Sequence, residues 1–183
     1  MRKQVDYVDG LFTDEFIQEV STKYHTNLFE YGNISNNPND AIFWSSRRLN
    51  DNSPITDCWH QKKILDVISD YYKFKTFKVD NQNIYINGQT YGLDGSMHID
   101  GEHSELSDDP RYTILYMVNW QDAGIQGFET NMGIVPFKAG RVVIFNSLMS
   151  HRGLSTEYLN SLRMTLTWKS CEIVLDKTSP LAL

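Results

Sequence analysis

Met97-His98-Ile99-Asp100-Gly101 is the segment from which fold and function can be interpreted, together with Ser150-His151-Arg152-Gly153 further along the chain. In an extended strand, residues two apart project from the same face, so His98 and Asp100 can bind one metal ion together. His151 is the expected third ligand. Two neutral imidazoles and one carboxylate on one side of an octahedral ion form a facial triad, which suits Fe(II) and leaves coordination positions open. The sequence therefore predicts an iron site.

A segment beyond His151 supplies a cation for the same region. Arg163 lies in the alternating run Ser161-Leu162-Arg163-Met164-Thr165-Leu166-Thr167-Trp168, which puts Arg163 and Thr165 on one face of a strand. A buried arginine is costly unless it is paired, and its guanidinium matches a carboxylate with two hydrogen bonds. If this face points inward, Arg163 predicts a ligand that carries a carboxylate.

Four further motifs occur along the chain, one before His98 and three between Asp100 and His151. They are Tyr85-Ile86-Asn87-Gly88-Gln89-Thr90-Tyr91, a strand from Tyr112 that ends at Asn119, Gly127-Phe128-Glu129-Thr130, and a proline and glycine turn with its strand over 135–147. With these motifs the sequence resembles the 2-oxoglutarate and Fe(II)-dependent dioxygenases, most closely the small prolyl 4-hydroxylase-like branch. The resemblance covers roughly Thr13 to Lys169 and is specific from Tyr85 onward.

The resemblance implies a set of cofactors and roles. Fe(II) would be bound by His98, Asp100 and His151, and 2-oxoglutarate would chelate the metal with its far carboxylate on Arg163. O₂ would be the second cosubstrate, with ascorbate as an accessory reductant. The expected reaction is hydroxylation of an unactivated C–H bond with release of succinate and CO₂. Because Asp100 fills a ligand position, hydroxylation is expected over halogenation.

The hydroxyl partner of the far carboxylate is less clearly indicated. The family often places a tyrosine where this chain has Met117, and Tyr116 would face the opposite side of a regular strand. Tyr85, which matches another family tyrosine, and Thr165 are therefore the expected hydrogen-bond donors to 2-oxoglutarate.

The order of elements indicates an α+β fold. Thr13 is a good N-cap for a first helix, a second helix is predicted at about 57–72, and 27–38 resembles a loop. From Phe77 to Val174, short runs of β-formers separated by Gly, Asn and Pro are typical of antiparallel strands. We expect a single domain over 1–183, with helical support at about 1–75 and a cupin-like jelly-roll core, the family's double-stranded β-helix, at about 76–174.

Composition limits the possible partners and the compartment. The 183 residues carry a net charge of −6, and the pI is about 5.3, which argues against nucleic acid as the main partner. No apolar run reaches membrane-spanning length, and the N-terminus lacks the apolar region of a signal peptide, so a cytoplasmic protein is expected. Cys58 and Cys171 are expected to be free thiols. The sequence does not fix an oligomeric state.

Three classes of function stay open. The first is a hydroxylase of a prolyl residue in a peptide or protein, which the resemblance favours, and the second is a hydroxylase of a free amino acid or other small metabolite. The third is a non-catalytic metal-binding jelly-roll protein, against which the combination of three ligands and Arg163 argues. The acidic loop 102–109, with His103, is interpreted as a solvated turn in preference to a rim for cationic substrates. Trp44 and Arg47 are candidates for a mobile cover, and core packing is the alternative role for Trp44.

Overall fold

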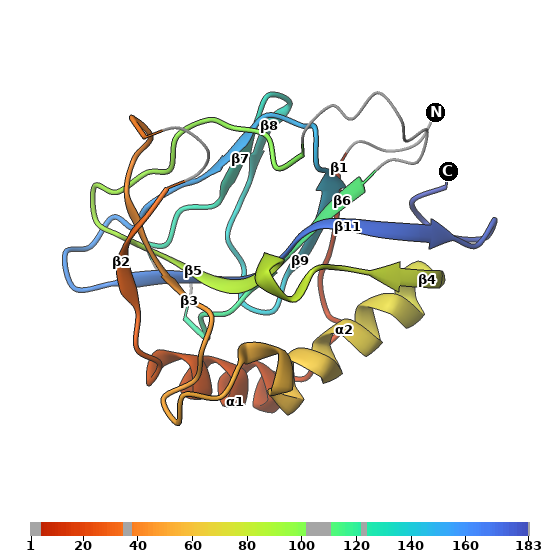
Figure 1. Cartoon of the computed structure of the whole chain (residues 1–183), viewed down its shortest axis with the longest axis horizontal. Coiled ribbons are helices and arrows are strands. Elements are labelled where there is room, and N and C mark those ends of the chain that lie inside the picture. The colour runs from red at the N-terminus through yellow and green to blue at the C-terminus, as the bar shows by residue number, and fades with distance from the viewer. Residues whose placement is uncertain (1–4, 35–37, 102–110, 122–123, 183) are drawn as a thin grey trace.

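Two β-sheets packed face to face form the body of the molecule (Figure 1). The computed structural model describes residues 5–34, 38–101, 111–121 and 124–182. The large sheet has eight strands in the order β1-β9-β6-β11-β5-β3-β2, with β4 also paired to β11, and the small sheet has the order β10-β7-β8. The large sheet contains β1 (Val5–Val8), β2 (Glu30–Asn33), β3 (Phe43–Ser46), β4 (Phe74–Lys78), β5 (Ile84–Thr90), β6 (Arg111–Met117), β9 (Val142–Asn146) and β11 (Leu162–Leu175). The small sheet contains β7 (Phe128–Thr130), β8 (Gly133–Val135) and β10 (His151–Gly153).

Two helices, α1 (Asp14–His25) and α2 (Trp59–Tyr72), lie beneath the large sheet, and short 3₁₀ turns occur at Ile55–Asp57 and Asn81–Asn83 (Figure 1). The predicted N-cap is confirmed, because the Thr13 hydroxyl accepts a hydrogen bond from the amide of Phe16 at 3.3 Å. Neither helix is long and apolar enough to cross a membrane, considering the described residues.

Alternation along the central strands builds two apolar layers. On β6, Ile114 and Tyr116 belong to the layer between the large sheet and the helices, whereas Leu115 and Met117 belong to the layer between the two sheets. Every strand residue from 112 to 117 is therefore buried. This arrangement confirms the predicted jelly-roll class, and Tyr116 faces the helices, as the strand pattern predicted.

The long strand β11 carries the polar face predicted from its sequence. Met164, Leu166 and Trp168 face the helices, so Arg163 and Thr165 face the space between the sheets. The pairing register with β6 shifts between Trp168 and Cys171, which marks a β-bulge.

The N-terminal part contains more strand than the sequence indicated. β1 and β2 join the large sheet beside β9 and β3, and β2 lies in the segment expected to be a loop, whereas a strand was expected at 41–49, where β3 lies. This strand is the outer edge of the sheet, and three of its four residues are exposed, so its sequence shows no apolar alternation. The pairing with β3, where the rings of Tyr31 and Trp44 lie 4.8 Å apart, was not readable from local sequence.

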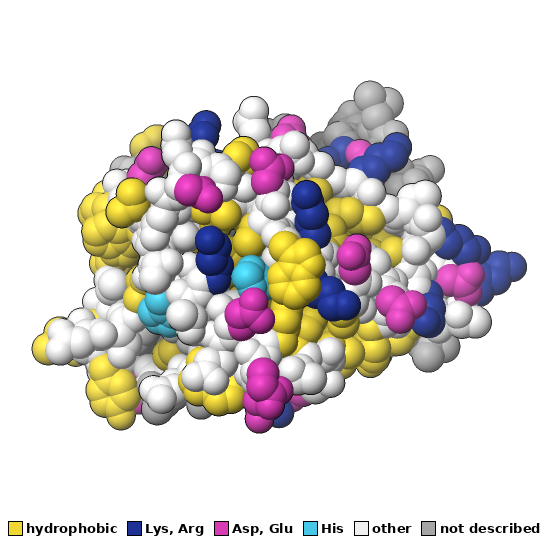
Figure 2. Space-filling view, turned by 90° about the horizontal axis from the view of Figure 1, so that it is seen from below, with side chains coloured by type: hydrophobic (Ala, Val, Ile, Leu, Met, Phe, Trp, Pro, Cys, Tyr) yellow, Lys and Arg dark blue, Asp and Glu magenta, His cyan; other side chains and the backbone are white. Residues whose placement is uncertain are grey.

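The helical face of the molecule has a mixed surface. Figure 2, which views the molecule from below, shows acidic and basic side chains interspersed with scattered apolar ones on this face. No extended basic stripe of the kind that binds nucleic acid is visible there. Cys58 and Cys171 are both buried and unbridged, as expected.

Candidate metal centre and cosubstrate pocket

His98 and His151 are held side by side by their own backbones. They form an isolated antiparallel bridge, with His98 N to His151 O at 3.0 Å and His151 N to His98 O at 2.9 Å. Each Nδ1 lies 2.8 Å from a backbone carbonyl, that of Ser96 for His98 and that of Met149 for His151. Because a carbonyl only accepts, each Nδ1 carries the proton, which leaves both Nε2 lone pairs free for a metal.

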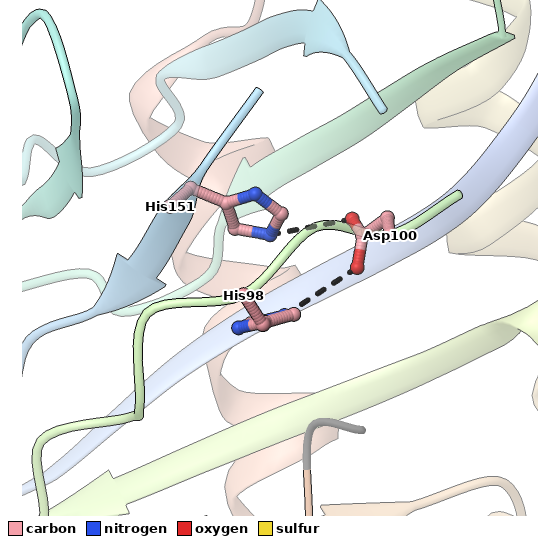
Figure 3. A group of neighbouring side chains, drawn as sticks. All are labelled: His98, Asp100 and His151. Carbon is pink, nitrogen blue, oxygen red and sulfur yellow. Dashed lines mark ion pairs between the residues drawn. The ribbon is translucent and has the colours of Figure 1, made fainter. Parts of the chain in front are cut away.

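Asp100 completes the group shown in Figure 3. Its Oδ1 lies 3.5 Å from Nε2 of His98, and its Oδ2 lies 3.3 Å from Nε2 of His151. The three ligand atoms lie within 4.8 Å of one another. Two neutral imidazole nitrogens and one carboxylate converging from one side fit the donor set of the expected Fe(II) triad. The structure thus brings together the three residues that the sequence singled out.

The carboxylate of Asp100 is held by partners that the sequence analysis did not identify. Thr113 Oγ1 donates to Asp100 Oδ2 at 2.7 Å, and Lys169 Nζ lies 3.2 Å from Oδ1. Burial by itself would raise the pKa of Asp100, but its contacts with the rings of His151 and His98 and the charge of Lys169 hold it well below its usual range. Asp100 is therefore an oriented anion, as a metal ligand must be.

The bulge on β11 explains how neighbouring residues reach Asp100. Ser170 has a positive φ of 55°, and its hydroxyl donates to the carbonyl of Asp100 at 2.7 Å. Lys169, the residue before it, reaches the carboxylate of the same aspartate. Two consecutive residues of a regular strand would point to opposite faces, so the bulge is what directs both at Asp100.

Arg163 lies deep in the cavity that also contains the three candidate ligands. Only 1% of its surface is exposed; Nη1 donates to Gln89 Oε1 at 2.5 Å, and Nε has no partner. Burial lowers the pKa of Arg163 to about 10, partly opposed by the charge of Asp94, so the guanidinium remains a cation at neutral pH. Since no ion pair holds Arg163 among the described residues, the site calls for an anionic ligand.

Gly153 makes room for this arginine. A Cβ at Gly153 would lie 3.0 Å from Arg163 Nη1 and 3.0 Å from Gln89 Nε2, closer than nearly all real Cβ contacts. Gly153 follows His151 by two positions on β10. A single short strand therefore supplies one candidate metal ligand and the space for the far end of the pocket.

Tyr85 and Thr165, the two expected hydroxyl donors, line the same cavity. The register between β5 and β11 pairs Arg163 with Gln89 and Thr165 with Asn87, whereas Tyr85 lies opposite Thr167. Burial, and to a lesser degree the charge of Asp100, raises the pKa of Tyr85, which keeps its hydroxyl a donor. The direct neighbour of Arg163 is thus Gln89, which the sequence analysis did not name.

Apolar rings shield the metal side of the cavity. The ring of His151 has Phe145 at 4.6 Å and Phe128 at 5.3 Å, measured between ring centroids. Phe128 occupies the position where the family motif has its second glycine, so this departure places a ring against a candidate ligand. On the outer side, Arg152 pairs with Glu129 at 2.6 Å and does not contact the metal centre.

Two other expectations concern the rim. Arg47 lines the cavity, while Trp44 packs on Tyr31 at the sheet edge. His103 and the acidic loop 102–109 lie outside the described residues.

Comparison with known proteins identifies the fold. No protein-family model and no curated protein matches the sequence. A viral collagen prolyl hydroxylase from Paramecium bursaria Chlorella virus-1, solved with 2-oxoglutarate, matches with a TM-score of 0.60 at 12% identity over 94% of this chain and 97% of that one. A Trichoplax adhaerens prolyl hydroxylase in complex with a hypoxia inducible factor peptide matches with a TM-score of 0.59 at 15% identity, over 91% and 83%.

HygX from Streptomyces hygroscopicus, solved with nickel and 2-oxoglutarate, matches with a TM-score of 0.58 at 12% identity over 92% of this chain and 82% of that one. The chain therefore has the double-stranded β-helix fold of the 2-oxoglutarate and Fe(II) oxygenases. At the level of fold, the resemblance expected from the sequence motifs is confirmed.

Proposed function

We propose that this protein is an Fe(II)- and 2-oxoglutarate-dependent dioxygenase that hydroxylates an unactivated C–H bond. One observation carries the proposal: the buried, unpaired cation of Arg163 lies in the same cavity as His98, Asp100 and His151. A metal scaffold alone has no use for a carboxylate receptor at that position. A dicarboxylate that chelates the metal with one end satisfies both features.

The side chains of the cavity would have separate roles in binding the metal and 2-oxoglutarate. His98, Asp100 and His151 would hold the metal from one side, and Thr113 and Lys169 orient the carboxylate ligand. Arg163, positioned by Gln89, would bind the far carboxylate of 2-oxoglutarate. When bound, Fe(II) and 2-oxoglutarate supply the oxidising power for hydroxylation, with release of succinate and CO₂.

The protein contributes orientation and a partly dry cavity. Phe128 and Leu115 are apolar residues that line the cavity near the candidate ligands, and Phe145 packs against the ring of His151. Exclusion of water there strengthens the charged contacts and limits side reactions of the oxidant.

Two substrate classes fit this proposal. The prolyl hydroxylases among the structural neighbours support a prolyl residue in a peptide or protein as substrate, although the identities of 12–15% leave the rim of this cavity to be judged on its own residues. A free amino acid or other small metabolite is the second class. Arg47, an exposed cation on the lining of the cavity, favours the second class.

The test is an anaerobic titration of the metal-free protein with Fe(II) and then with 2-oxoglutarate. We expect the weak visible charge-transfer band of the chelate in the parent protein and no band in Asp100→Ala. Slow succinate release in air without added substrate would show turnover independently. Iron binding with neither a band nor succinate release would instead support the non-catalytic metal-binding protein.

A further inference from the structure

We propose that the primary substrate is a free amino acid whose carboxylate binds Arg47 at the mouth of the cavity and whose amino group donates a hydrogen bond to Asn87. This inference rests on the proposed function and extends it to the second, substrate-binding half of the site. Arg47 is an exposed residue that lines the cavity, and it follows directly on β3.

The charges that line the described part of the cavity leave room for a carboxylate group in addition to those of 2-oxoglutarate. Among the described lining residues, Arg47, Arg163 and Lys169 are cationic and Asp100 is the single carboxylate. Bound Fe(II) and Arg163 together carry three positive charges, which 2-oxoglutarate and Asp100 match. Among the described lining residues, Lys169 and Arg47 are then in excess of the carboxylates, and of these two cations only Lys169 contacts Asp100. A substrate carboxylate beside Arg47 would give this cation a partner, whereas a substrate without a carboxylate would leave it unpaired.

Arg47 is held in place for such a contact. Its Nε donates to the carbonyl of Gln82 at 3.2 Å, and its guanidinium carbon lies 5.5 Å from the ring centroid of Tyr85. Tyr85 is buried and forms part of the cavity wall. These contacts use one face and one nitrogen of the guanidinium, and no described carboxylate pairs with its terminal nitrogens. The planar fork that recognises a carboxylate is therefore already positioned.

Asn87 adds a requirement that 2-oxoglutarate does not meet. Its Oδ1 is buried, lies on a cavity-lining residue and has no hydrogen-bond partner among the described residues. An unpaired buried acceptor is costly, so it calls for a donor. At neutral pH 2-oxoglutarate carries only acceptors. Asn87 lies two residues from Tyr85 on β5, on the same face as the aromatic wall beneath Arg47. A free amino acid offers both groups, a carboxylate for Arg47 and an N–H donor for Asn87.

The test uses Zn(II)-loaded protein saturated with 2-oxoglutarate, which cannot turn over. Saturation-transfer NMR is used to examine three samples for binding. They are a mixture of the twenty standard L-amino acids, the matching carboxamides, and a capped prolyl peptide. We expect at least one free amino acid to bind and its carboxamide to bind at least about tenfold more weakly. Arg47→Gln should weaken amino-acid binding about ten- to hundredfold, because a charge-assisted contact is lost.

Arg48→Gln is the matched control. Arg48 is the neighbouring exposed arginine, it donates to the carbonyl of Asn52 at 2.9 Å, and it does not line this cavity. Equal weakening by the two variants, equal binding of acids and carboxamides, or binding of the capped peptide alone would overturn the proposal. So would the absence of amino-acid binding to protein that does bind Zn(II) and 2-oxoglutarate. Failure to bind 2-oxoglutarate at all would instead remove the proposed function.

Discussion

Thr113 offers the sharpest test of how the metal centre is built. Its hydroxyl donates to Asp100 Oδ2 at 2.7 Å, on a side chain that is fully buried. Thr113→Val keeps the shape and removes this hydrogen bond. A hydrogen bond to a charged group contributes about 1.5–3 kcal/mol, which corresponds to about a ten- to hundredfold change in an equilibrium constant. Loss of a partner that orients a metal ligand typically has the same effect on metal affinity.

The chain supplies a matched control in Thr167. This threonine is also buried in the large sheet and lines the cavity, but its hydroxyl has no hydrogen-bond partner. Thr167→Val should therefore change metal affinity less than about twofold. Thr113 has a second role, because it also accepts from the amide of Ser170 at 3.3 Å, so its variant should lose some stability as well.

The assay is competition for Zn(II) against a fluorescent chelator, with circular dichroism to establish that both variants are folded. We expect the Kd for Zn(II) to rise about ten- to hundredfold in Thr113→Val alone. Unchanged affinity in that variant would refute the orienting role. An equal loss in both variants would show that the effect comes from repacking between the sheets.

Three further predictions concern Arg163, Gly153 and Asp9. Arg163→Met should weaken 2-oxoglutarate binding to the Zn(II) protein by about a hundredfold and leave Zn(II) affinity unchanged. It should not lower the melting temperature of the metal-free protein, because a buried cation without an ion-pair partner among the described residues is removed. A parallel loss of Zn(II) and 2-oxoglutarate binding in calorimetry would contradict this. Gly153→Ala should raise the KM for 2-oxoglutarate several-fold, since the new methyl group crowds Arg163 and Gln89, and an unchanged KM would show that the pocket relaxes freely. The hydrogen bond from Arg141 holds the pKa of Asp9 at about 2 against burial, with help from Lys138. A depressed carboxyl pKa stabilises the fold above the unfolded-state pKa, so Asp9→Asn should cost about 2 kcal/mol at pH 7, and this difference should disappear as the pH falls from about 4 to 2 in denaturant titrations. A constant difference across that range would show that the ion pair is not responsible.

Much of the large sheet was readable from local pattern, because apolar alternation reports which face of a strand is buried. The run around Arg163 predicted its inward face. The motif at His98 and Asp100, together with His151, predicted three candidate ligands that the structure brings together. The edge strand β2 was missed for the same reason, since an exposed strand has no apolar face to display. The ligands also sit outside regular strand at His98 and Asp100, where backbone hydrogen bonds to His151 and Ser147 fix them.

The sequence by itself determined the fold class, the candidate ligands and the cation at the far end of the pocket, because each depends on residue type and short-range spacing. Only the tertiary structure identified the residues that hold them. Gln89 binds Arg163 although 74 positions of sequence separate them. Lys169 contacts Asp100 because of a β-bulge that the local sequence does not predict. Such contacts depend on how distant strands pair, and strand register is decided by the packing of the whole core and not by any one segment.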